Sequence, residues 1–433
     1  MSGLLISGGV VVTTEGPKEM DLLLDDGEIH IGETGSSDAV IDASGHLIYP
    51  GLIDCHVHFR EPGAEHKATM ATEALAARSG GITTVCDMPN TSPATTTIEA
   101  FADKVERASV VKDCDIRFFF GVTEKDHIEQ LRSLWIEPDH DHLRSKCSGV
   151  KVYFDHSTGN QKIASELLDE LFAMCGELAI PIVGHCEDPE LNASAAASVS
   201  GEDVALHSQM RPPEAEAKSI AHAIKLSREH GAAFHVAHMS TAEGVQLVSD
   251  AKSEGLPITC EVAPHHLLLT ADHYEHMGAL VKMNPPLRDT RHLDALWGAI
   301  EDGTVDCIAT DHAPHTMQEK DAQPPLSAPS GVPGVETMLP LLLTAAAEDS
   351  GFYQRILDLC FTSPNRIFNL GKEDIEDGSS ADIVIIDPAE EWEIHGEDLH
   401  SKCGWTPYEG AKVKGRVKHV LRSSEDYSMK ELV

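Results

Sequence analysis

Residues 51–60 read GLIDCHVHFR, an apolar run that ends in two histidines, His56 and His58. Continuous apolar runs rich in Ile and Val are typical of strands that are buried on both faces. Side chains two apart on a strand point to the same side, so the two imidazoles are expected to lie together. A pair of this kind at the end of a buried strand could grip one metal ion.

Seven further runs of the same character follow, and helix-like stretches such as EHKATMATEALAARSG separate most of them. Eight strands that alternate with helices predict an α/β protein built as a (β/α)8 TIM barrel. The predicted strands are residues 52–59, 82–88, 115–122, 150–154, 180–186, 233–239, 257–262 and 305–311.

The two ends of the chain have a different pattern. The segments GLLISGGVVVT near the start and SADIVIIDP and GRVKHVLR near the end look like strands of β-hairpins. We therefore predict that residues 1–50 and 371–433 combine into one small β-sandwich domain, with the barrel, residues 51–370, inserted between them.

Charge and composition limit the function classes. The 433 residues include 71 acidic and 33 basic ones, a formal net charge of −38 that is spread along the chain. Such a surface repels nucleic acid and anionic membranes, and no apolar run is long enough to span a bilayer. Dispersed acidity with few lysines suggests a halophilic protein, because concentrated salt screens the self-repulsion. An ordinary acidic cytosolic protein is the alternative.

The ten cysteines form no CxxC pair, so no zinc-ribbon or thioredoxin motif is present. Several lie inside apolar runs, which is typical of small buried side chains in a reducing compartment. The N-terminus lacks the basic segment of a signal peptide. We expect a cytoplasmic protein.

Polar residues also mark the ends of four later strands. They are Lys151 in GVKVYF, His185 in VGHCE, His238 in VAHMS and Asp311 in ATDHAPH. The active site of a TIM barrel lies at the carboxyl ends of its strands. Burying such groups unpaired costs about 1–3 kcal/mol each, and a shared metal centre would remove that cost. Imidazole and carboxylate ligands suit zinc.

Lys151 is the unusual member of this set, because an ammonium group is a poor metal ligand. Reaction with carbon dioxide would turn it into a carbamate, whose two oxygens can bridge two cations. Two-metal sites place the ions about 3.5–4 Å apart and activate a bridging water. The sequence thus favours two metal ions held by His56, His58, Lys151, His185, His238 and Asp311.

Five motifs together resemble the dihydroorotases of the amidohydrolase superfamily. They are GLIDCHVHFREPG, GGITTVCDMPNT, TCEVAPHHLLLT, VKMNPPLR and DHAPHT. The resemblance implies the reversible cyclisation of N-carbamoyl-L-aspartate to L-dihydroorotate plus water, a step of pyrimidine biosynthesis. It also implies two zinc ions per subunit, with manganese or cobalt as substitutes, and a homodimer is expected.

The resemblance assigns roles by position. His56, His58, Lys151 and Asp311 would hold the buried metal, and Lys151, His185 and His238 the more exposed one. Asp311 would act as general base and acid. Some dihydroorotases use an aspartate slightly later than the lysine, which makes Asp155 the reserve bridge. The substrate would be bound by Arg60, Asn90, Asn284 and His315.

Other interpretations stay open. Asn90 could instead cap a helix that starts near Thr95, and the loop 316–335 would close over the substrate. Allantoinase or dihydropyrimidinase chemistry would use the same kind of centre. A non-catalytic paralogue is a further alternative, although such proteins usually lose metal ligands and every ligand position is filled here.

Overall fold

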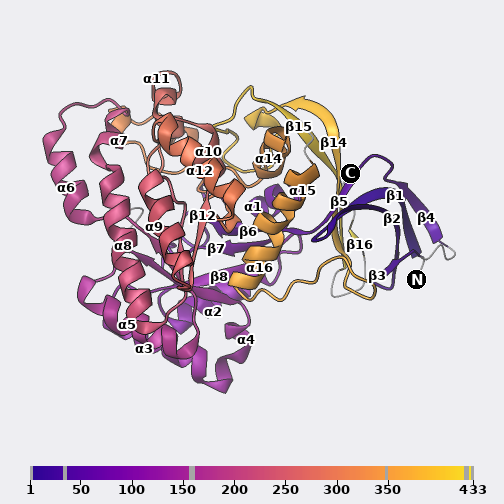
Figure 1. Cartoon of the computed structure of the whole chain (residues 1–433), viewed down its shortest axis with the longest axis horizontal. Coiled ribbons are helices and arrows are strands. Elements are labelled where there is room, and N and C mark those ends of the chain that lie inside the picture. The colour runs from indigo at the N-terminus through magenta and orange to yellow at the C-terminus, as the bar shows by residue number, and fades with distance from the viewer. Residues whose placement is uncertain (1–2, 33–36, 156–160, 347–349, 424–428, 431–433) are drawn as a thin grey trace.

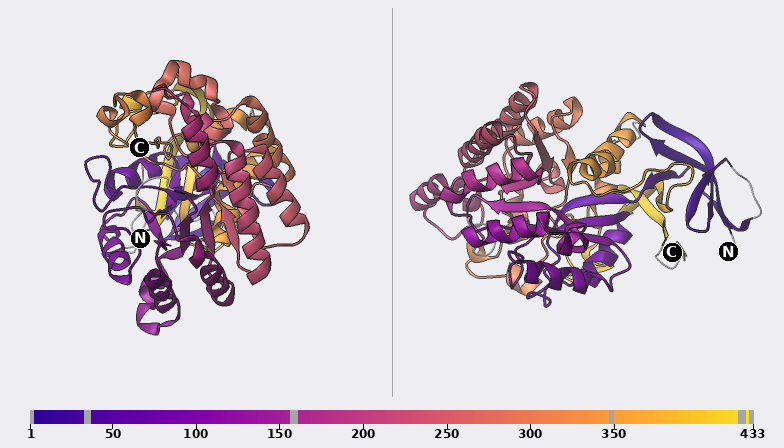
Figure 2. Two further views of the ribbon diagram at one scale, coloured as in Figure 1. Left: turned by 90° about the vertical axis from the view of Figure 1, so that its left-hand side faces the viewer. Right: turned by 90° about the horizontal axis from the view of Figure 1, so that it is seen from below.

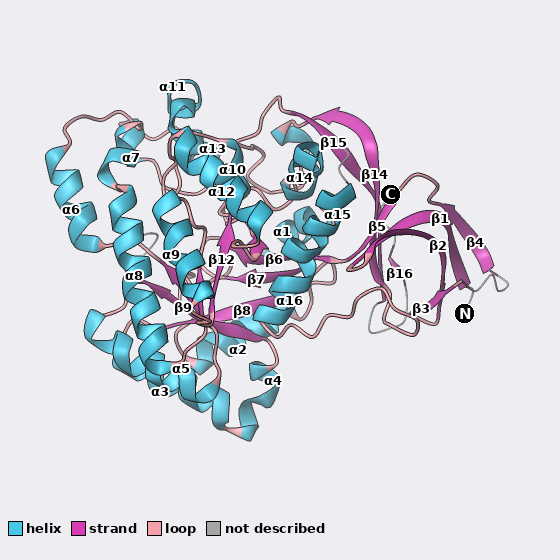
Figure 3. Ribbon diagram, in the orientation of Figure 1, coloured by secondary structure: helices cyan, strands magenta, loops and turns pink. Residues whose placement is uncertain are grey.

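Eight parallel strands form one sheet, close to the eight predicted runs. The computed structural model describes residues 3–32, 37–155, 161–346, 350–423 and 429–430. The spatial order of the strands follows the chain. Figures 1 and 3 show the barrel strands among the helices that flank them. They are β6 (Leu52–Val57), β7 (Ile82–Asp87), β8 (Asp115–Gly121), β9 (Cys147–Tyr153), β10 (Ile182–His185), β11 (Phe234–Val236), β12 (Ile258–Val262) and β13 (Cys307–Ile308).

The last and first strands meet just beyond β13. Val57 and His312 form a parallel bridge, and the backbone N–H of His58 donates to the carbonyl of His312 at 2.7 Å. This contact closes the sheet into a barrel, as predicted. It also places the ends of β6 and β13 side by side, so that His58 and Asp311 start from neighbouring positions.

Helices surround the barrel strands (Figure 2). Side-chain caps mark several helix starts: Thr69, Thr97, Thr241 and Asp289 each accept a hydrogen bond from the first turn that follows. The longer helices are α1 (Met70–Ser79), α2 (Ile98–Ala108), α3 (Lys125–Ile136), α5 (Leu168–Leu178), α6 (Pro189–Ser198), α8 (Pro213–His230), α9 (Ala242–Ser253), α12 (Thr290–Asp302), α14 (Met338–Ala346) and α15 (Ser350–Leu357).

The shorter helical segments lie mostly in the connections. The α-helical ones are α4 (Asp141–Arg144), α7 (Leu206–Met210), α10 (Pro264–Leu268), α11 (Tyr274–Met277), α13 (Met317–Lys320) and α16 (Ser363–Ile367), and residues Asp358–Thr362 form a π-helical turn that leads into α16. Among the described residues, no helix is both long and apolar enough to cross a membrane.

Both ends of the chain contribute to a second sheet, beside the barrel (Figure 1). The two parts join where β5 pairs antiparallel with β14. The prediction of one small β domain from both ends is therefore correct, whereas its boundaries at residues 50 and 371 stay predictions. Its strands are β1 (Gly3–Thr13), β2 (Gly16–Asp25), β3 (Glu28–Ile31), β4 (Ser37–Asp42), β5 (Leu47–Pro50), β14 (Asp382–Glu393), β15 (Lys412–Ser423) and β16 (Met429–Lys430).

The segment 394–411, between β14 and β15, leaves the small domain and packs on the barrel. The indole N–H of Trp405 donates to the carbonyl of His315 at 2.7 Å. The hydroxyl of Ser401 donates to buried Glu73 of α1 at 2.6 Å. The C-terminal part of the chain thereby supports the mouth of the barrel, which the sequence did not reveal.

Candidate metal centre and substrate site

The structure brings the predicted side chains to one end of the barrel. His185 ends β10, His238 follows β11 and Asp311 follows β13, and all three are buried. A small cavity lies among them. Its lining consists of His56, His58, Tyr153, His185, His238, Asn284, Asp311, Ala313, Ser330 and Gly331.

His56, His58 and Asp311 form one compact group. The Nε2 atoms of His56 and His58 lie 3.4 Å and 3.0 Å from Oδ1 of Asp311, and one donor atom of each residue lies within 4.8 Å of the others. Burial raises the pKa of Asp311, but the two imidazoles outweigh this effect and hold the pKa well below its usual range. The group offers two nitrogens and an ionised carboxylate to a cation.

His185 and His238 form a second pair. Nδ1 of His185 lies 3.0 Å from Nε2 of His238, and the rings meet edge to face. Nε2 of His185 faces the carboxylate of Glu187 at 2.7 Å, so its proton is directed to that carboxylate and the lone pair of Nδ1 points at His238. The two ring nitrogens thus lie together, and a cation that replaces the proton between them would be held by both.

Lys151 lies near both groups. It is 1% exposed, and its Nζ has no hydrogen-bond partner among the described residues. Burial lowers its pKa to about 8. Burial, together with the charge of Lys151, also lowers the pKa of both His56 and His238. An unpartnered buried amine beside four imidazoles and a carboxylate is a donor set that fits a two-metal centre with a modified lysine.

Asp155, the reserve bridge, lies in a different contact. Its Oδ2 accepts a hydrogen bond from Asn192 at 2.8 Å and lies 3.8 Å from Nη2 of Arg211. It belongs to none of the compact groups of possible ligands found among the described residues.

Two buried carboxylates, neither of them among the predicted site residues, support these histidines. Oε1 of Glu261, on β12, contacts Nδ1 of His56 and accepts the backbone N–H of His238 at 3.1 Å. Glu187 holds His185 and is paired in turn with Arg211 at 2.5 Å. Each acid interrupts or directly follows an apolar run. This position in the sequence could have identified both as functional residues.

Strand β6 is irregular where it matters most. Its register with β7 shifts between Asp54 and Val57, so successive side chains do not alternate strictly between the two faces of the strand there. Adjacent residues Cys55 and His56 consequently both contact Glu261, the thiol at 3.4 Å from Oε2.

Arg60 and His315 lie together beside the cavity without lining it, and this pair is called the rim below. Arg60 has a left-handed backbone with φ of 68°, and its Nε donates to the carbonyl of Pro314 at 3.0 Å. Its Nη2 lies 3.1 Å from Nε2 of His315, and Lys67 lies 3.0 Å from the other ring nitrogen. Positive φ also occurs at His238 and Asp311, and such strain clusters at functional sites.

The two predicted asparagines occupy separate places. Oδ1 of Asn90 lies 2.6 Å from Nδ1 of His58. Asn90 does not cap a helix, because α2 begins at Ile98 with Thr97 as its cap. Oδ1 of Asn284 lies 2.8 Å from Nε2 of His207 and accepts from the hydroxyl of Ser330 at 3.2 Å.

The loop 316–335 contributes Ser330 and Gly331 to the lining of the cavity, and its closure over a substrate stays a prediction. Buried Lys320 fastens the loop. Its ammonium donates to the carbonyls of Lys282, Pro329 and Gly331 at 3.2, 3.0 and 3.0 Å. At Gly331 a φ of +136° and the close carbonyl of Ala313 leave no room for a side chain.

Comparisons with known proteins agree with this geometry. The model of the amidohydrolase family matches residues 47–425. A dihydroorotase from Halobacterium salinarum is 40% identical over 90% of this chain and 89% of its own length. One from Staphylococcus epidermidis is 37% identical over 95% and 96%.

Solved structures are similar over nearly the whole chain. A dihydropyrimidinase from Brevibacillus agri has a TM-score of 0.89 at 28% identity and covers 99% of this chain and 96% of its own. An L-hydantoinase from Arthrobacter aurescens has a TM-score of 0.90 at 26% identity, with coverage of 100% and 98%. These matches and the strand-end site together show that the chain belongs to the amidohydrolase family.

Proposed function

We propose that this chain is a metal-dependent cyclic amidohydrolase with dihydroorotase activity. It interconverts N-carbamoyl-L-aspartate with L-dihydroorotate and water, a step of pyrimidine biosynthesis. The observation that carries the proposal is the convergence of four histidines, Asp311 and an unpartnered lysine beneath a rim that carries Arg60 and His315. The relatives named dihydroorotase, 37–40% identical over at least 90% of this chain, support the substrate.

The proposed centre holds two metal ions, with zinc as the expected metal. His56, His58 and Asp311 would bind one ion and His185 and His238 the other, and carbamylated Lys151 would bridge them. When bound, such ions polarise a carbonyl and raise the acidity of water. The lone pairs that this requires are already directed by Glu261 and Glu187, which hold the remaining nitrogens of His56 and His185.

Asp311 is the proposed general base and acid. In ring opening it accepts a proton from the attacking water and delivers this proton to the ring nitrogen as the amide C–N bond breaks. In ring closure it takes a proton from the carbamoyl nitrogen, and the side-chain carboxyl loses one oxygen as water. Its low pKa keeps it ionised at neutral pH, the form that both a metal ligand and a proton acceptor need.

The rim supplies recognition of a carboxylate. The planar guanidinium of Arg60 can bind a carboxylate through two parallel hydrogen bonds. His315 lies against it, and Asn90 and Asn284 add amide groups near the same cavity. This cationic rim would attract a dianionic substrate to a protein of net charge −38.

A second candidate is hydrolysis of a cyclic amide without a carboxylate, as by a dihydropyrimidinase. The solved structures named dihydropyrimidinase or hydantoinase favour it, at 26–28% identity. Arg60 and the more similar dihydroorotases weigh against it.

The test is an assay of the purified, metal-loaded enzyme on dihydroorotate, dihydrouracil and allantoin side by side. We expect turnover of dihydroorotate, with the other two slower by orders of magnitude. Turnover of dihydrouracil or allantoin without dihydroorotate would refute the substrate. A folded protein that binds no metal would instead indicate a non-catalytic paralogue.

The salt adaptation, cellular location and oligomeric state of the enzyme are part of the proposal. The acidic surface and the Halobacterium relative support a halophilic, cytoplasmic enzyme. We also propose a homodimer, which sedimentation at high salt can test.

A further inference from the structure

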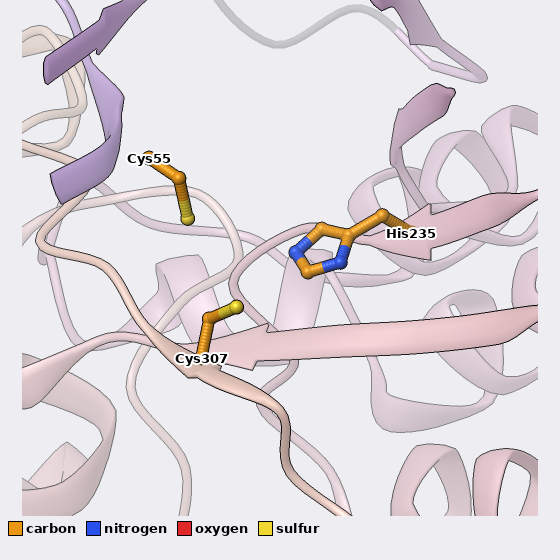
Figure 4. Close-up of side chains that lie close together, drawn as sticks. All are labelled: Cys55, His235 and Cys307. Atoms are coloured by element: carbon orange, nitrogen blue, oxygen red, sulfur yellow. The ribbon is translucent and has the colours of Figure 1, made fainter. Parts of the chain in front are cut away.

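Three buried side chains converge in the barrel next to the proposed centre and are not part of it (Figure 4). Cys55 comes from β6, His235 from β11 and Cys307 from β13, and they are 1%, 1% and 0% exposed. One donor atom of each lies within 4.8 Å of the other two. In Figure 4 both thiols and the imidazole point toward a common space.

We propose that Cys55, His235 and Cys307 form a binding site for one thiophilic cation. Thiolates are soft ligands that select ions such as Cu⁺ over ions that prefer oxygen. A tetrahedral zinc site would need a fourth donor. The nearest carboxylate, Glu261, contacts both Cys55 and His235 through Oε2, so the preference for a soft three-coordinate ion rests on the two sulfurs and not on the lack of an oxygen donor.

The ring of His235 can present Nε2 to a cation once its proton moves. Nε2 now lies 3.1 Å from Oε2 of Glu261, so it carries the ring proton and donates to that carboxylate. On binding, the proton passes to Nδ1, where the hydroxyl of Thr259 at 2.8 Å can accept it, and the lone pair of Nε2 becomes free. Binding forms two metal–sulfur bonds and one metal–nitrogen bond. The two thiol protons go to solvent, and no electron is transferred.

The site is coupled to the proposed catalytic centre through Glu261. The carboxylate now contacts the thiol of Cys55 and Nε2 of His235, and both contacts are lost when a cation takes these atoms. The same carboxylate orients His56, so binding should loosen that ligand and lower activity. This coupling rests on the proposed function, whereas the binding itself does not.

The experiment begins from a parent variant, C147A/C403A, which removes the two thiols that are only half-buried. The metal-loaded parent is titrated without oxygen, once with Cu⁺ in a weak chelator and once with Hg²⁺. We expect one equivalent to bind, with a thiolate-to-metal absorption band and an X-ray absorption signature of two sulfurs and one nitrogen. Both Cys55→Ala and Cys307→Ala should weaken binding at least tenfold.

Cys175→Ala is the matched control, because Cys175 is equally buried but lies on α5, outside the barrel strands. It should leave the titration unchanged. The proposed site would be refuted if the Cys55 and Cys307 variants bound the cation as tightly as the parent, or if only one sulfur coordinated it. If those variants do not fold by near-UV circular dichroism, His235→Gln takes their place and should remove the nitrogen signal.

The coupling has separate readouts. Catalytic metal content and kcat are followed in the same titration of the parent. A fall in both at one equivalent supports coupling through Glu261. Binding with unchanged metal content and kcat would refute the coupling and leave the site in place. Because binding is detected spectroscopically, an enzyme inactive on dihydroorotate would refute the proposed function alone.

Discussion

At the scale of single residues, the sequence predicted the atoms that can hold a metal better than those that orient them. His56, His58, His185, His238 and Asp311 stand out because each is a polar group at the end of an apolar run. Glu261 acts on His56 through a contact across the barrel, 205 residues apart in the chain, and no spacing encodes such a contact. Glu187 lies only two residues after His185, but nothing in the sequence indicates that its carboxylate turns back onto that imidazole. The shared contact of Cys55 and His56 with Glu261 depends on a register shift, which alternation along a strand cannot predict.

Replacing Glu261 by Gln tests its positioning role. The change preserves shape but removes the charge that holds Nδ1 of His56, and loss of such a supporting group costs about 10–100-fold in metal affinity or activity. We expect lower retention of catalytic metal and a fall in kcat, with less change in KM. Metal analysis and steady-state kinetics measure this.

Glu254→Gln is the control for that variant. Glu254 is exposed and pairs with Arg228 on the surface, where ion pairs contribute about 0–1 kcal/mol. It should behave as wild type. Equal metal retention in both variants would contradict a role for Glu261.

Replacing Lys151 by Met tests the buried amine. Methionine fills similar volume without an unpartnered ammonium, so the metal-free variant should unfold at the same or a higher denaturant concentration than the metal-free wild type. Activity should fall at least a thousandfold if the bridge is lost, an order-of-magnitude expectation from multi-kcal effects in metal catalysis. A variant that keeps both metal ions and its activity would show that Lys151 is no bridge.

At the scale of elements, the apolar runs located the strands within a few residues because strands buried on both faces need continuous apolar sequence. The run 305–311 is the largest departure, since only Cys307–Ile308 pair as β13, although Ala309 still donates to the carbonyl of Val262 and Asp311 lines the cavity. The packing of segment 394–411 on the barrel was not predictable, because its contacts join residues far apart in the chain. Trp405 and Ser401 illustrate this.

Because Lys320 is buried where it holds the loop 316–335, the free energy of unfolding should depend on pH. Burial lowers the pKa of Lys320 to about 7, below its ordinary value in the unfolded chain. From about pH 7 to pH 10 the unfolded state therefore binds more protons at this residue, and stability should rise with pH, by at most about 1.4 kcal/mol per unit.

Lys320→Met removes this contribution. Denaturant unfolding of wild type and variant between pH 6 and pH 10 should show a difference in stability that moves in favour of wild type as pH rises. The variant should also have a higher KM, because the loop loses two hydrogen bonds to its own carbonyls, Pro329 and Gly331, and one to the carbonyl of Lys282 outside it. Parallel stability curves would contradict the depressed pKa.

At the scale of the whole molecule, composition predicted a property that no single contact shows. A net charge of −38 destabilises the folded state by self-repulsion, and 1 M salt reduces the screening length to about 3 Å. We expect the melting temperature to rise by ten degrees or more, an order-of-magnitude figure, between about 0.1 M and 2 M KCl. Calorimetry measures this shift.

A control separates screening from the general salting-out effect of salt. Sucrose strengthens burial by exclusion from the surface but screens no charge. At equal water activity, sucrose should produce only a small part of the rise in melting temperature that KCl produces. A melting temperature that does not change with KCl would refute the halophilic interpretation.

The pairing of β5 with β14 has a consequence for biogenesis. The first fifty residues include five strands, yet the partner that extends their sheet beyond β5 is made only when the ribosome has nearly finished the chain. During translation β5 therefore exposes an open edge, to which a neighbouring nascent chain could attach. A chain truncated before β14 would contain the barrel but lack part of the second sheet. Proteases should then cleave the amino-terminal strands first.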